Sequence, residues 1–592
     1  MITRRGVLAL LALVAFAAAC VPPKEPPPLP PFGLPCVSPP GSPVSGNDPL
    51  RTGWYPDQPG LNPSAGGACA FGELWSAQVD GQQYAQPLVD PGTNTLLVAT
   101  ETNHVYGFNA TTGAPKWARN DLGQPFNPDD LGGCADLTPT VGITSTPAID
   151  AATHTAYLFA KEYVSGASGA VQWKAHAIDL DTGQEKPKFP VVIQGEAANL
   201  PPDVPPGTGA TFEAQHTLQR PGLLLMNGVV YAAFGGHCDL PPYRGWVVGV
   251  NATSGAITTL WTDEAIPSAT NDSPEAGIWH AGGRLVTDAP GNILLVSGNG
   301  VAPAAPTPGK PLASPTLGEA AIRLQVQNDG SLKPTDFFAP CNAADLSAQD
   351  QDIGSGAPLV LPDSFGTSQV RHVVVVVGKQ GPIYLLNRDD LGGFQQGPAG
   401  SCIDGSGHPG DNIPSSFALP GVPGIWATPA MWPGEGGNIF VPYPTFSGDT
   451  PGKLTSYRVV DDGTGKPILS LDGQSQDSFG FGSSSAIVTS DGQTPGSALV
   501  WIVFLPDSSG ANAELRAYDP TPTDGILQLR GSWPIGTGNK FTTPTVSNGR
   551  IYVGTRDGAV RAFGVTGQSA QSVQPNRSRV GANAVPGPDV EG

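Results

Sequence analysis

The sequence predicts an all-β fold, an eight-bladed β-propeller with four strands in each blade, on three observations. The chain of 592 residues holds 78 glycines and 64 prolines yet keeps 39% hydrophobic residues, which indicates many short strands joined by many turns. Helical periodicity over about 11 or more residues is almost absent. A strand-turn-strand unit recurs about every 65 residues, a spacing that suits a four-stranded blade with insertions.

The repeated unit can be followed along the chain. It begins with a proline or an apolar residue, continues through an apolar strand, and reaches an Asp or Asn followed by a Thr/Ser-Gly turn and often a tryptophan. The eight copies begin at Pro87, Pro147, Pro221, Arg284, Pro358, Pro429, Ala486 and Pro544. We therefore expect the innermost strand of each blade just after these positions.

The two ends of the repeat array complement each other. The last copy stops at the Thr566-Gly567 turn without an outer strand, and an orphan strand at 73–79 precedes the first copy. We expect this N-terminal strand to complete the eighth blade, because ring closure removes exposed strand edges. The alternative is a seven-bladed ring with an independent first hairpin.

The N-terminus has the pattern of an export signal. Arg4 and Arg5 precede an apolar run at 7–19, which is shorter than the roughly 20 residues of a spanning helix. Cys20 follows small residues, an arrangement that resembles the lipobox of bacterial lipoproteins. We expect an exported protein that is lipid-anchored to the cell membrane through Cys20; the alternative is an ordinary signal peptide cleaved nearby.

Composition divides the remaining chain. We expect a signal peptide at 1–19, a lipidated cysteine and proline-rich stalk at 20–65, the propeller at 66–567 and a disordered tail at 568–592. The formal charge of −20 without a long basic run disfavours nucleic acid as a partner. We expect a monomer.

Six cysteines remain besides Cys20, and an even number in an exported chain indicates three disulfides. We expect Cys36 to pair with Cys69, joining the stalk to the propeller, and Cys341 to pair with Cys402, because both lie in loops flanking one blade. The other pairings stay open. No cysteines are spaced as a CxxC zinc site.

The segments VYGFNATTGAPKW (105–117), AIDLDTG (177–183) and VVGVNATSGAITTLW (247–261) resemble the repeats of the pyrroloquinoline quinone (PQQ) propeller superfamily. The resemblance implies the quinoprotein fold, with the tryptophan capping the packing between blades. Some members are PQQ-dependent alcohol dehydrogenases with calcium and a pair of adjacent cysteines, and others hold no cofactor. This chain has no adjacent cysteines and no CxxCH haem motif. It looks closer to secreted lipoprotein members, which share stretches such as FGGHCD (234–239), GIWHAGG (277–283) and DIGSG (352–356).

Residues that enter the innermost strands should form a ring at one mouth of the central channel. Their aromatic, hydroxyl, amide and imidazole groups suit a ligand with a planar or sugar-like face. Arg220 is the most informative, because a buried guanidinium needs a carboxylate or an anionic ligand. The alternative is that these side chains plug the channel. The candidates are Gln86, Thr146, Arg220, Trp279, His280, Trp426, Thr428 and Phe541.

Two weaker metal sites are also visible. His237 and Asp239 could ligate a metal or perform acid–base chemistry, and Asp350 and Asp352 could hold calcium through oxygen ligands.

The leading functional hypothesis is a non-catalytic binding or scaffold lipoprotein that recognises an envelope protein or a small ligand through the loop-rich face of the propeller. The alternative is a divergent PQQ-dependent oxidoreductase acting on alcohols or sugars, with PQQ and calcium as cofactors.

Overall fold

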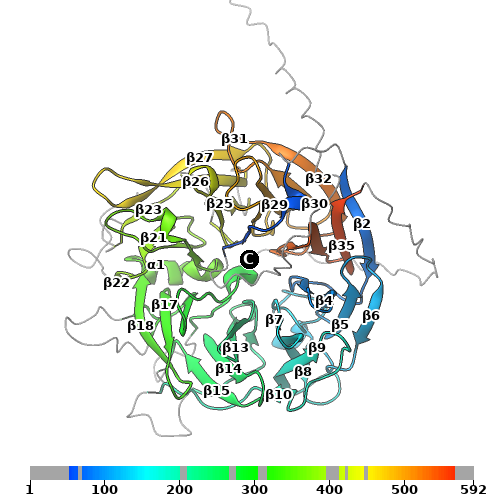
Figure 1. Cartoon of the computed structure of the whole chain (residues 1–592). Helices are drawn as coiled ribbons and strands as arrows, with labels where there is room; N and C mark the ends of the chain where they lie inside the picture. The colour runs from blue at the N-terminus through cyan, green and yellow to red at the C-terminus, as the bar shows by residue number, and fades with distance from the viewer. Residues whose placement is uncertain are drawn as a thin grey trace, which may run out of the picture. The chain divides into compact units, whose positions relative to one another are not determined.

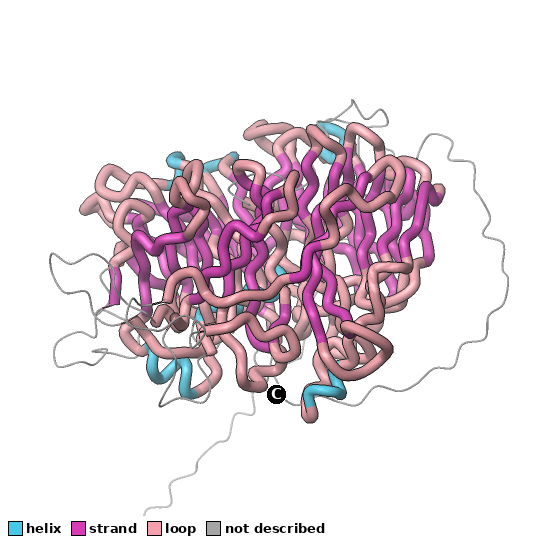
Figure 2. Tube along the Cα trace, turned by 90° about the horizontal axis from the view of Figure 1, so that it is seen from below, coloured by secondary structure: helices cyan, strands magenta, loops and turns pink. Residues whose placement is uncertain are grey.

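The computed structural model describes residues 52–63, 70–200, 210–265, 275–303, 316–394, 413–419, 424–445 and 451–566, which belong to one compact unit. These residues form eight sheets that surround a central axis as the blades of a propeller (Figure 1). Viewed from the side, the strands cross the thickness of the ring and the loops gather on its two faces (Figure 2). The predicted eight-bladed all-β fold is confirmed.

The first four blades follow the chain in order. Blade 1 consists of β3 (Leu88–Asp90), β4 (Thr95–Ala99), β5 (Val105–Asn109) and β6 (Pro115–Arg119). Blade 2 consists of β7 (Ala148–Asp150), β8 (Thr155–Tyr163), β9 (Val171–Asp179) and β10 (Val191–Val192). Blade 3 consists of β12 (Leu224–Met226), β13 (Val229–Gly236), β14 (Trp246–Asn251) and β15 (Ile257–Thr262), with β11 (Thr217–Leu218) also on β13. Blade 4 consists of β16 (Asn292–Val296), β17 (Ala321–Val326), β18 (Leu332–Ala339) and β22 (Gly393–Phe394).

The last four blades complete the ring. Blade 5 consists of β19 (Leu359–Val360), β20 (Val373–Val377), β21 (Ile383–Asn387) and β23 (Ser415–Phe417). Blade 6 consists of β24 (Ala430–Trp432), β25 (Asn438–Tyr443), β26 (Lys453–Asp461), β27 (Pro467–Ser475) and β31 (Ile526–Leu527). Blade 7 consists of β1 (Trp54–Tyr55), β28 (Ile487–Thr489), β29 (Leu499–Phe504), β30 (Ala513–Tyr518) and β32 (Leu529–Gly536). Blade 8 consists of β33 (Thr545–Ser547), β34 (Arg550–Gly554), β35 (Ala559–Val565) and β2 (Phe71–Gln78).

Helices are short and lie in loops. The described residues include α1 (Ala343–Ala348) and the 3₁₀ turns η1 (Pro59–Leu61), η2 (Pro128–Leu131), η3 (His280–Gly282), η4 (Ile353–Ser355), η5 (Asp363–Phe365) and η7 (Gly434–Gly436). Among these residues no helix has the length and apolar character needed to cross a membrane.

Six of the eight predicted copies open directly on an inner strand, and in blade 3 the strand begins three residues after Pro221, at Leu224. In blade 4, the segment after Arg284 instead forms an isolated antiparallel bridge between Val286 and Leu294. The predicted closure is also confirmed: β2 pairs antiparallel with β35 from Phe71 opposite Val565 to Gln78 opposite Ala559. A strand near the start of the described residues and the last described strand are therefore hydrogen-bonded within one sheet.

The repeated Asp/Asn and Gly have a physical role in the turn between the third and fourth strands of a blade. The Oδ1 atom of Asn109 accepts hydrogen bonds from the backbone N–H groups of Thr111 and Thr112, each at 3.0 Å. Gly113 then adopts a φ of +73°, where its missing Cβ leaves room for the ring of Trp75 from blade 8. Trp117 packs in the same way against Gly183 of blade 2. These two tryptophans join neighbouring blades, as the family resemblance implied.

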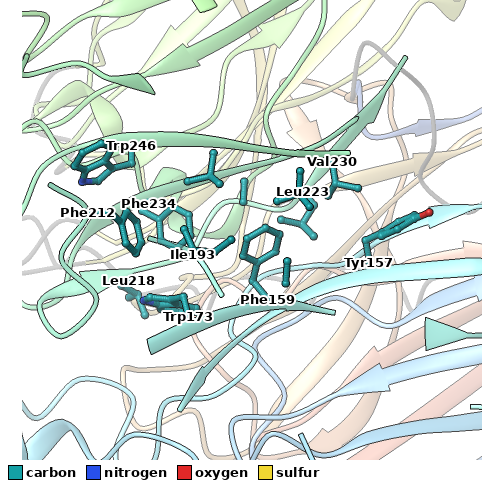
Figure 3. Close-up of a cluster of buried hydrophobic side chains, with 14 of the residues drawn as sticks. Tyr157, Phe159, Trp173, Ile193, Phe212, Leu218, Leu223, Val230, Phe234 and Trp246 are labelled. Carbon is teal, nitrogen blue, oxygen red and sulfur yellow. The ribbon is translucent and has the colours of Figure 1, made fainter. Parts of the chain in front are cut away.

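The core lies between blades and is rich in aromatic rings. Between blades 2 and 3, Phe234 meets Trp173 and Phe212 edge to face, with ring centroids 5.4 Å and 5.1 Å apart (Figure 3). Trp246 packs against Phe212 in the same arrangement, at 5.6 Å. Such edge-to-face contacts stabilise aromatic pairs beyond their burial, so each blade is held to the next by its own side chains.

Residues 52–63 lie within the range expected to form the stalk, but they pack against the propeller. β1 pairs in parallel with β28, and the Gln58 side chain accepts a hydrogen bond of 2.9 Å from the Gly549 backbone in blade 8. Leu61 is fully buried in the core shared by blades 7 and 8. Apolar residues interrupt the proline-rich composition here, and their burial holds the segment against the ring. Residues 52–63 are called the N-terminal strap below.

The strap should contribute to stability through Leu61. Replacing Leu61 by Ala would lower the free energy of unfolding by about 2–5 kcal/mol, because it empties a fully buried site between two blades. Leu471→Ala is the matched control, since Leu471 is 44% exposed and its loss should change the free energy by no more than about 0.5 kcal/mol. Urea denaturation of both variants measures the difference, and equal effects would contradict the packing.

Candidate functional site

The mouth of the channel, formed where the chain enters the inner strands, is covered by aromatic side chains. Trp426 and Phe541 are buried together with Ala281, and Trp279 and Phe481 pack against them. The Phe481 ring meets Trp426 and Phe541 edge to face, with centroid distances of 5.4 Å and 5.5 Å. Three of the predicted ligand-binding residues, Trp279, Trp426 and Phe541, are thus brought together into one apolar cluster.

Arg220 lies beside this cluster and is only 6% exposed. Its guanidinium carbon is 5.6 Å from the centroid of the Tyr84 ring, and its Nη2 donates a long hydrogen bond of 3.5 Å to the Lys540 carbonyl. Among the described residues, no carboxylate is close enough to Arg220 for an ion pair. A Cβ at Gly282, where φ is +85°, would lie 2.2 Å from Nη1, so the guanidinium occupies space that only a glycine leaves.

Acidic groups stand near Arg220 without pairing with it. Asp136 instead forms an ion pair of 2.6 Å with Lys540. The buried Glu101 accepts hydrogen bonds at one oxygen from Gly142 N (2.8 Å) and the Thr144 hydroxyl (3.0 Å), while its other oxygen has no partner among the described residues. Burial raises the pKa of Glu101 to about 7, so at neutral pH its negative charge is only partial. Arg220 therefore has weak compensation for its buried charge.

The remaining polar candidates satisfy one another across blades. The Gln86 backbone N–H donates to the Thr146 hydroxyl at 3.1 Å, and the Gln86 amide donates to the Pro544 carbonyl at 2.8 Å. Thr428 N–H donates to the Ser485 hydroxyl at 2.9 Å. Gln86 and Thr428 also line a small cavity of about 80 Å³ beside the N-terminal strap. The folded chain thus supplies hydrogen-bond partners to all three residues.

His280 is also held by the protein itself. It is fully buried, its Nε2 lies 3.0 Å from the backbone of Val296, and burial lowers its pKa to about 4. His280 and Ala281 have φ angles of +49° and +44°, in the left-handed region that non-glycine residues rarely adopt. Backbone strain of this kind is found at binding sites held by their surroundings, and here it places Ala281 in the aromatic cluster.

Asp350 and Asp352 are joined by a lysine. The Lys379 Nζ lies 2.5 Å from Asp350 Oδ1 and 2.7 Å from Asp352 Oδ2, and Trp279 Nε1 donates to Asp352 Oδ1 at 3.1 Å. Burial disfavours the charged lysine, but the two carboxylates outweigh it and raise the pKa of Lys379 above its usual value. A calcium ion between these carboxylates would have to displace this ammonium group, so the pair does not fit calcium as it stands.

His237 and Asp239 flank a disulfide. Cys238 bonds Cys134, which ties blade 3 to the loop between blades 1 and 2, and both sulfurs are thereby removed from metal binding. His237 Nε2 lies 3.3 Å from the Asp136 carbonyl, and burial lowers the pKa of His237 to about 4. Asp239 accepts a hydrogen bond of 3.0 Å from the Tyr243 hydroxyl. The sequence analysis named no partner for Cys134 or Cys238, and their bridge is the one that the two named pairs leave if all six cysteines are bonded.

Cys341 is disulfide-bonded as well, to a partner outside the described residues. Cys20, Cys36, Cys69 and Cys402 lie outside the described residues, so the lipidation site and the two predicted pairings stay predictions. The sequence analysis missed Glu101, Lys379 and Lys540. These residues adjoin the mouth but are not among the candidates chosen at the entries to the innermost strands. Nothing in the local sequence of these three residues marks them.

The buried His280 should make stability depend on pH. In the folded protein its pKa is about 4, whereas an unfolded chain has the ordinary value of about 6.5. The unfolded state therefore binds more protons between these values, so stability falls as the pH drops from 6.5 to 4. His280→Gln should lessen that fall by about 1–3 kcal/mol, measured by urea denaturation. Above pH 7 the two curves should run parallel, and unchanged acid sensitivity would contradict this assignment.

No protein-family model matches the sequence, and no curated protein matches it either. Among solved structures, the quinohemoprotein alcohol dehydrogenase from Comamonas testosteroni is similar, with a TM-score of 0.54 and 16% identity over 92% of this chain and 83% of that one. A europium-containing methanol dehydrogenase has a TM-score of 0.54 and 12% identity over 89% of this chain and 99% of that one. BamB from Moraxella catarrhalis has a TM-score of 0.46 and 12% identity over 84% and 100%. The chain therefore shares the β-propeller fold of the quinoprotein alcohol and methanol dehydrogenases, as its repeats predicted.

Proposed function

We propose that this protein is an exported, lipid-anchored binding or scaffold module of the cell envelope, which receives an acidic group of its ligand or partner on Arg220. The observation that carries the proposal is the environment of that side chain. Arg220 is 6% exposed and has a cation–π contact, a 3.5 Å hydrogen bond and no ion pair among the described residues. Burying a guanidinium with so little compensation is unfavourable, and a carboxylate from outside would relieve it.

The chemistry of the mouth suits an acidic group better than a bulky ring. Arg220 can donate two parallel hydrogen bonds to one carboxylate, which gives both energy and orientation. The neighbouring rings of Trp426 and Phe541 are 7% and 6% exposed, so they leave little surface for a large planar ligand to stack on. We therefore propose a carboxylate on a narrow side chain as the group that Arg220 receives.

The same features argue against a quinone cofactor with calcium. A tricyclic quinone would have to separate Trp426 from Phe481 and Phe541, which pack edge to face across the mouth. Calcium would have to displace Lys379 from Asp350 and Asp352. We therefore derive no reaction step through PQQ, and the fold shared with the dehydrogenases supports common architecture alone.

Succinate tests the role of Arg220, with succinamide as its uncharged match. Wild-type protein should bind succinate with a dissociation constant in the millimolar range, measured by the change in intrinsic tryptophan fluorescence, to which Trp279 and Trp426 contribute at the mouth. Arg220→Gln should weaken binding at least tenfold, because a charged hydrogen-bonded contact is worth about 1.5–3 kcal/mol. Arg458→Gln is the matched control, since Arg458 pairs with Asp472 at 3.0 Å in blade 6.

Two outcomes would overturn the proposal. The first is equal binding of succinate and succinamide, or by the wild type and Arg220→Gln, since the charge of Arg220 would then be irrelevant. The second is dye-linked oxidation of an alcohol or sugar together with a higher melting temperature after addition of PQQ and calcium. That result would favour the divergent oxidoreductase.

The lipid anchor is tested separately. In a bacterial host, the wild-type protein should partition into the detergent phase of a Triton X-114 extraction, because the sequence around Cys20 resembles a lipobox. Cys20→Ser should move the protein into the aqueous phase, whereas Cys36→Ser should leave partitioning unchanged. Detergent partitioning of Cys20→Ser like that of the wild type would contradict the anchor.

A further inference from the structure

A second cleft lies at the opposite ends of the strands, between blades 4 and 5. It has a volume of about 590 Å³ and is formed by residues that leave β19 and β21 or precede β16 and β20, with Arg323 from β17. Because β19 runs away from the mouth, the residues after Val360 lie on the far face of the ring. A volume of this size falls within the roughly 300–1,000 Å³ of small-molecule sites.

Arg388 is the most poorly compensated charge of this cleft. Its side chain is 11% exposed, its ion pair with Asp363 spans 3.8 Å, and its hydrogen bond to the Leu361 carbonyl is 3.4 Å long. Its Nε atom is buried and has no hydrogen-bond partner among the described residues. Arg388 therefore presents donor capacity that the folded chain does not use.

Arg323 forms the neighbouring wall and differs in its pairing. It donates to Asp288 at 2.6 Å, yet its own Nε is likewise buried without a partner in the described part of the chain. Burial is the largest effect on the pKa of Arg388 and lowers it, the carboxylates of Asp288 and Asp363 oppose that effect, and repulsion by Arg323 lowers the pKa further. An anion placed between them would relieve that repulsion.

The rest of the lining is polar and offers partners for hydroxyl groups. Asn292 donates a long hydrogen bond of 3.3 Å to Asp288, and His372 contacts both oxygens of Asp389 at 2.9 Å. Asp389 is 64% exposed, so its carboxylate can accept hydrogen bonds from a ligand. Leu361 supplies the apolar part of the wall. The cleft thus offers both oxygen acceptors and N–H donors.

From these contacts we infer that the cleft between blades 4 and 5 binds a small acidic sugar, whose carboxylate pairs with Arg388 and Arg323 and whose hydroxyl groups bond Asp389, Asn292 and His372. The weakly held guanidinium of Arg388 beside Arg323 suits an oxyanion, and the surrounding carboxylate and amide groups suit hydroxyls. A ligand with a carboxylate and no hydroxyls would leave the second set unused. This inference is independent of the site at Arg220, which lies at the other face.

The test uses D-glucuronate as the probe and D-glucose as its uncharged match, with the full-length protein in isothermal titration calorimetry. We expect glucuronate to bind with a millimolar dissociation constant and glucose at least tenfold more weakly. Arg388→Gln should weaken glucuronate binding at least tenfold. Arg458→Gln, which removes a paired arginine from blade 6, should stay within twofold of the wild type.

Further measurements separate a lost site from a lost fold. Arg388→Lys keeps the charge but loses the fork of donors, and it should bind between the wild type and Arg388→Gln with an unchanged melting temperature. Unchanged glucuronate binding by Arg388→Gln, equal binding of glucose, or equally tight binding of inorganic phosphate would each overturn the inference. So would the failure of the wild type to bind glucuronate, galacturonate and gluconate.

Discussion

Closure of the ring is the constraint on which the rest of the structure depends. It rests on hydrogen bonds between β2 and β35, segments separated by nearly the whole folded chain. In the completed blade 8, Tyr552 packs against blade 1, and its hydroxyl donates a hydrogen bond of 3.0 Å to the Ala110 carbonyl. Without this pairing, blades 8 and 1 would expose strand edges and apolar faces, which favour aggregation. The strap adds a second fastening beside the closure, through Gln58 and Leu61.

The geometry of the mouth depends on the closure of the ring. Its side chains come from different blades, so their distances are fixed by how the ring is closed and not by local sequence. The backbone carbonyl of Gln83, at the start of blade 1, accepts a hydrogen bond of 3.1 Å from Asn539, which precedes blade 8. Arg220 in turn reaches Tyr84 on one side and the Lys540 carbonyl on another. Weakening the pairing of β2 with β35 would therefore move the partners of Arg220 before it disturbed the individual blades.

The elements that could be predicted from the sequence are those that recur with the repeat or depend on local turn residues. Contacts between residues of different blades could not be predicted, because they depend on the geometry of the ring. The strand starts after Pro87, Pro147 and Pro544, and the closing strand, follow from a repeat whose turn chemistry is visible in the residues themselves. Lys379 and the Cys134–Cys238 bridge could not be found in this way, because the residues that meet there come from different loops. The range assigned to the stalk extended too far for a similar reason: composition averaged over 20–65 hid the few apolar residues of the strap.

Arg220 and Arg388 differ from most other described arginines in the weakness of their contacts with carboxylates, and this difference supports both proposed sites. Arg458 and Arg561 pair with carboxylates at 3.0 Å and 2.7 Å, although both are partly exposed and need such partners least. Arg220 and Arg388 are more buried, and their hydrogen bonds of 3.5 Å and 3.4 Å are long. Burial alone does not explain the difference, because Arg323 and Arg516 are about as buried as Arg388 and pair with carboxylates at 2.6 Å and 2.7 Å. Departures from such local rules are expected where a site is reserved for a ligand, and these two lie on opposite faces of the ring, one for each binding event that we propose.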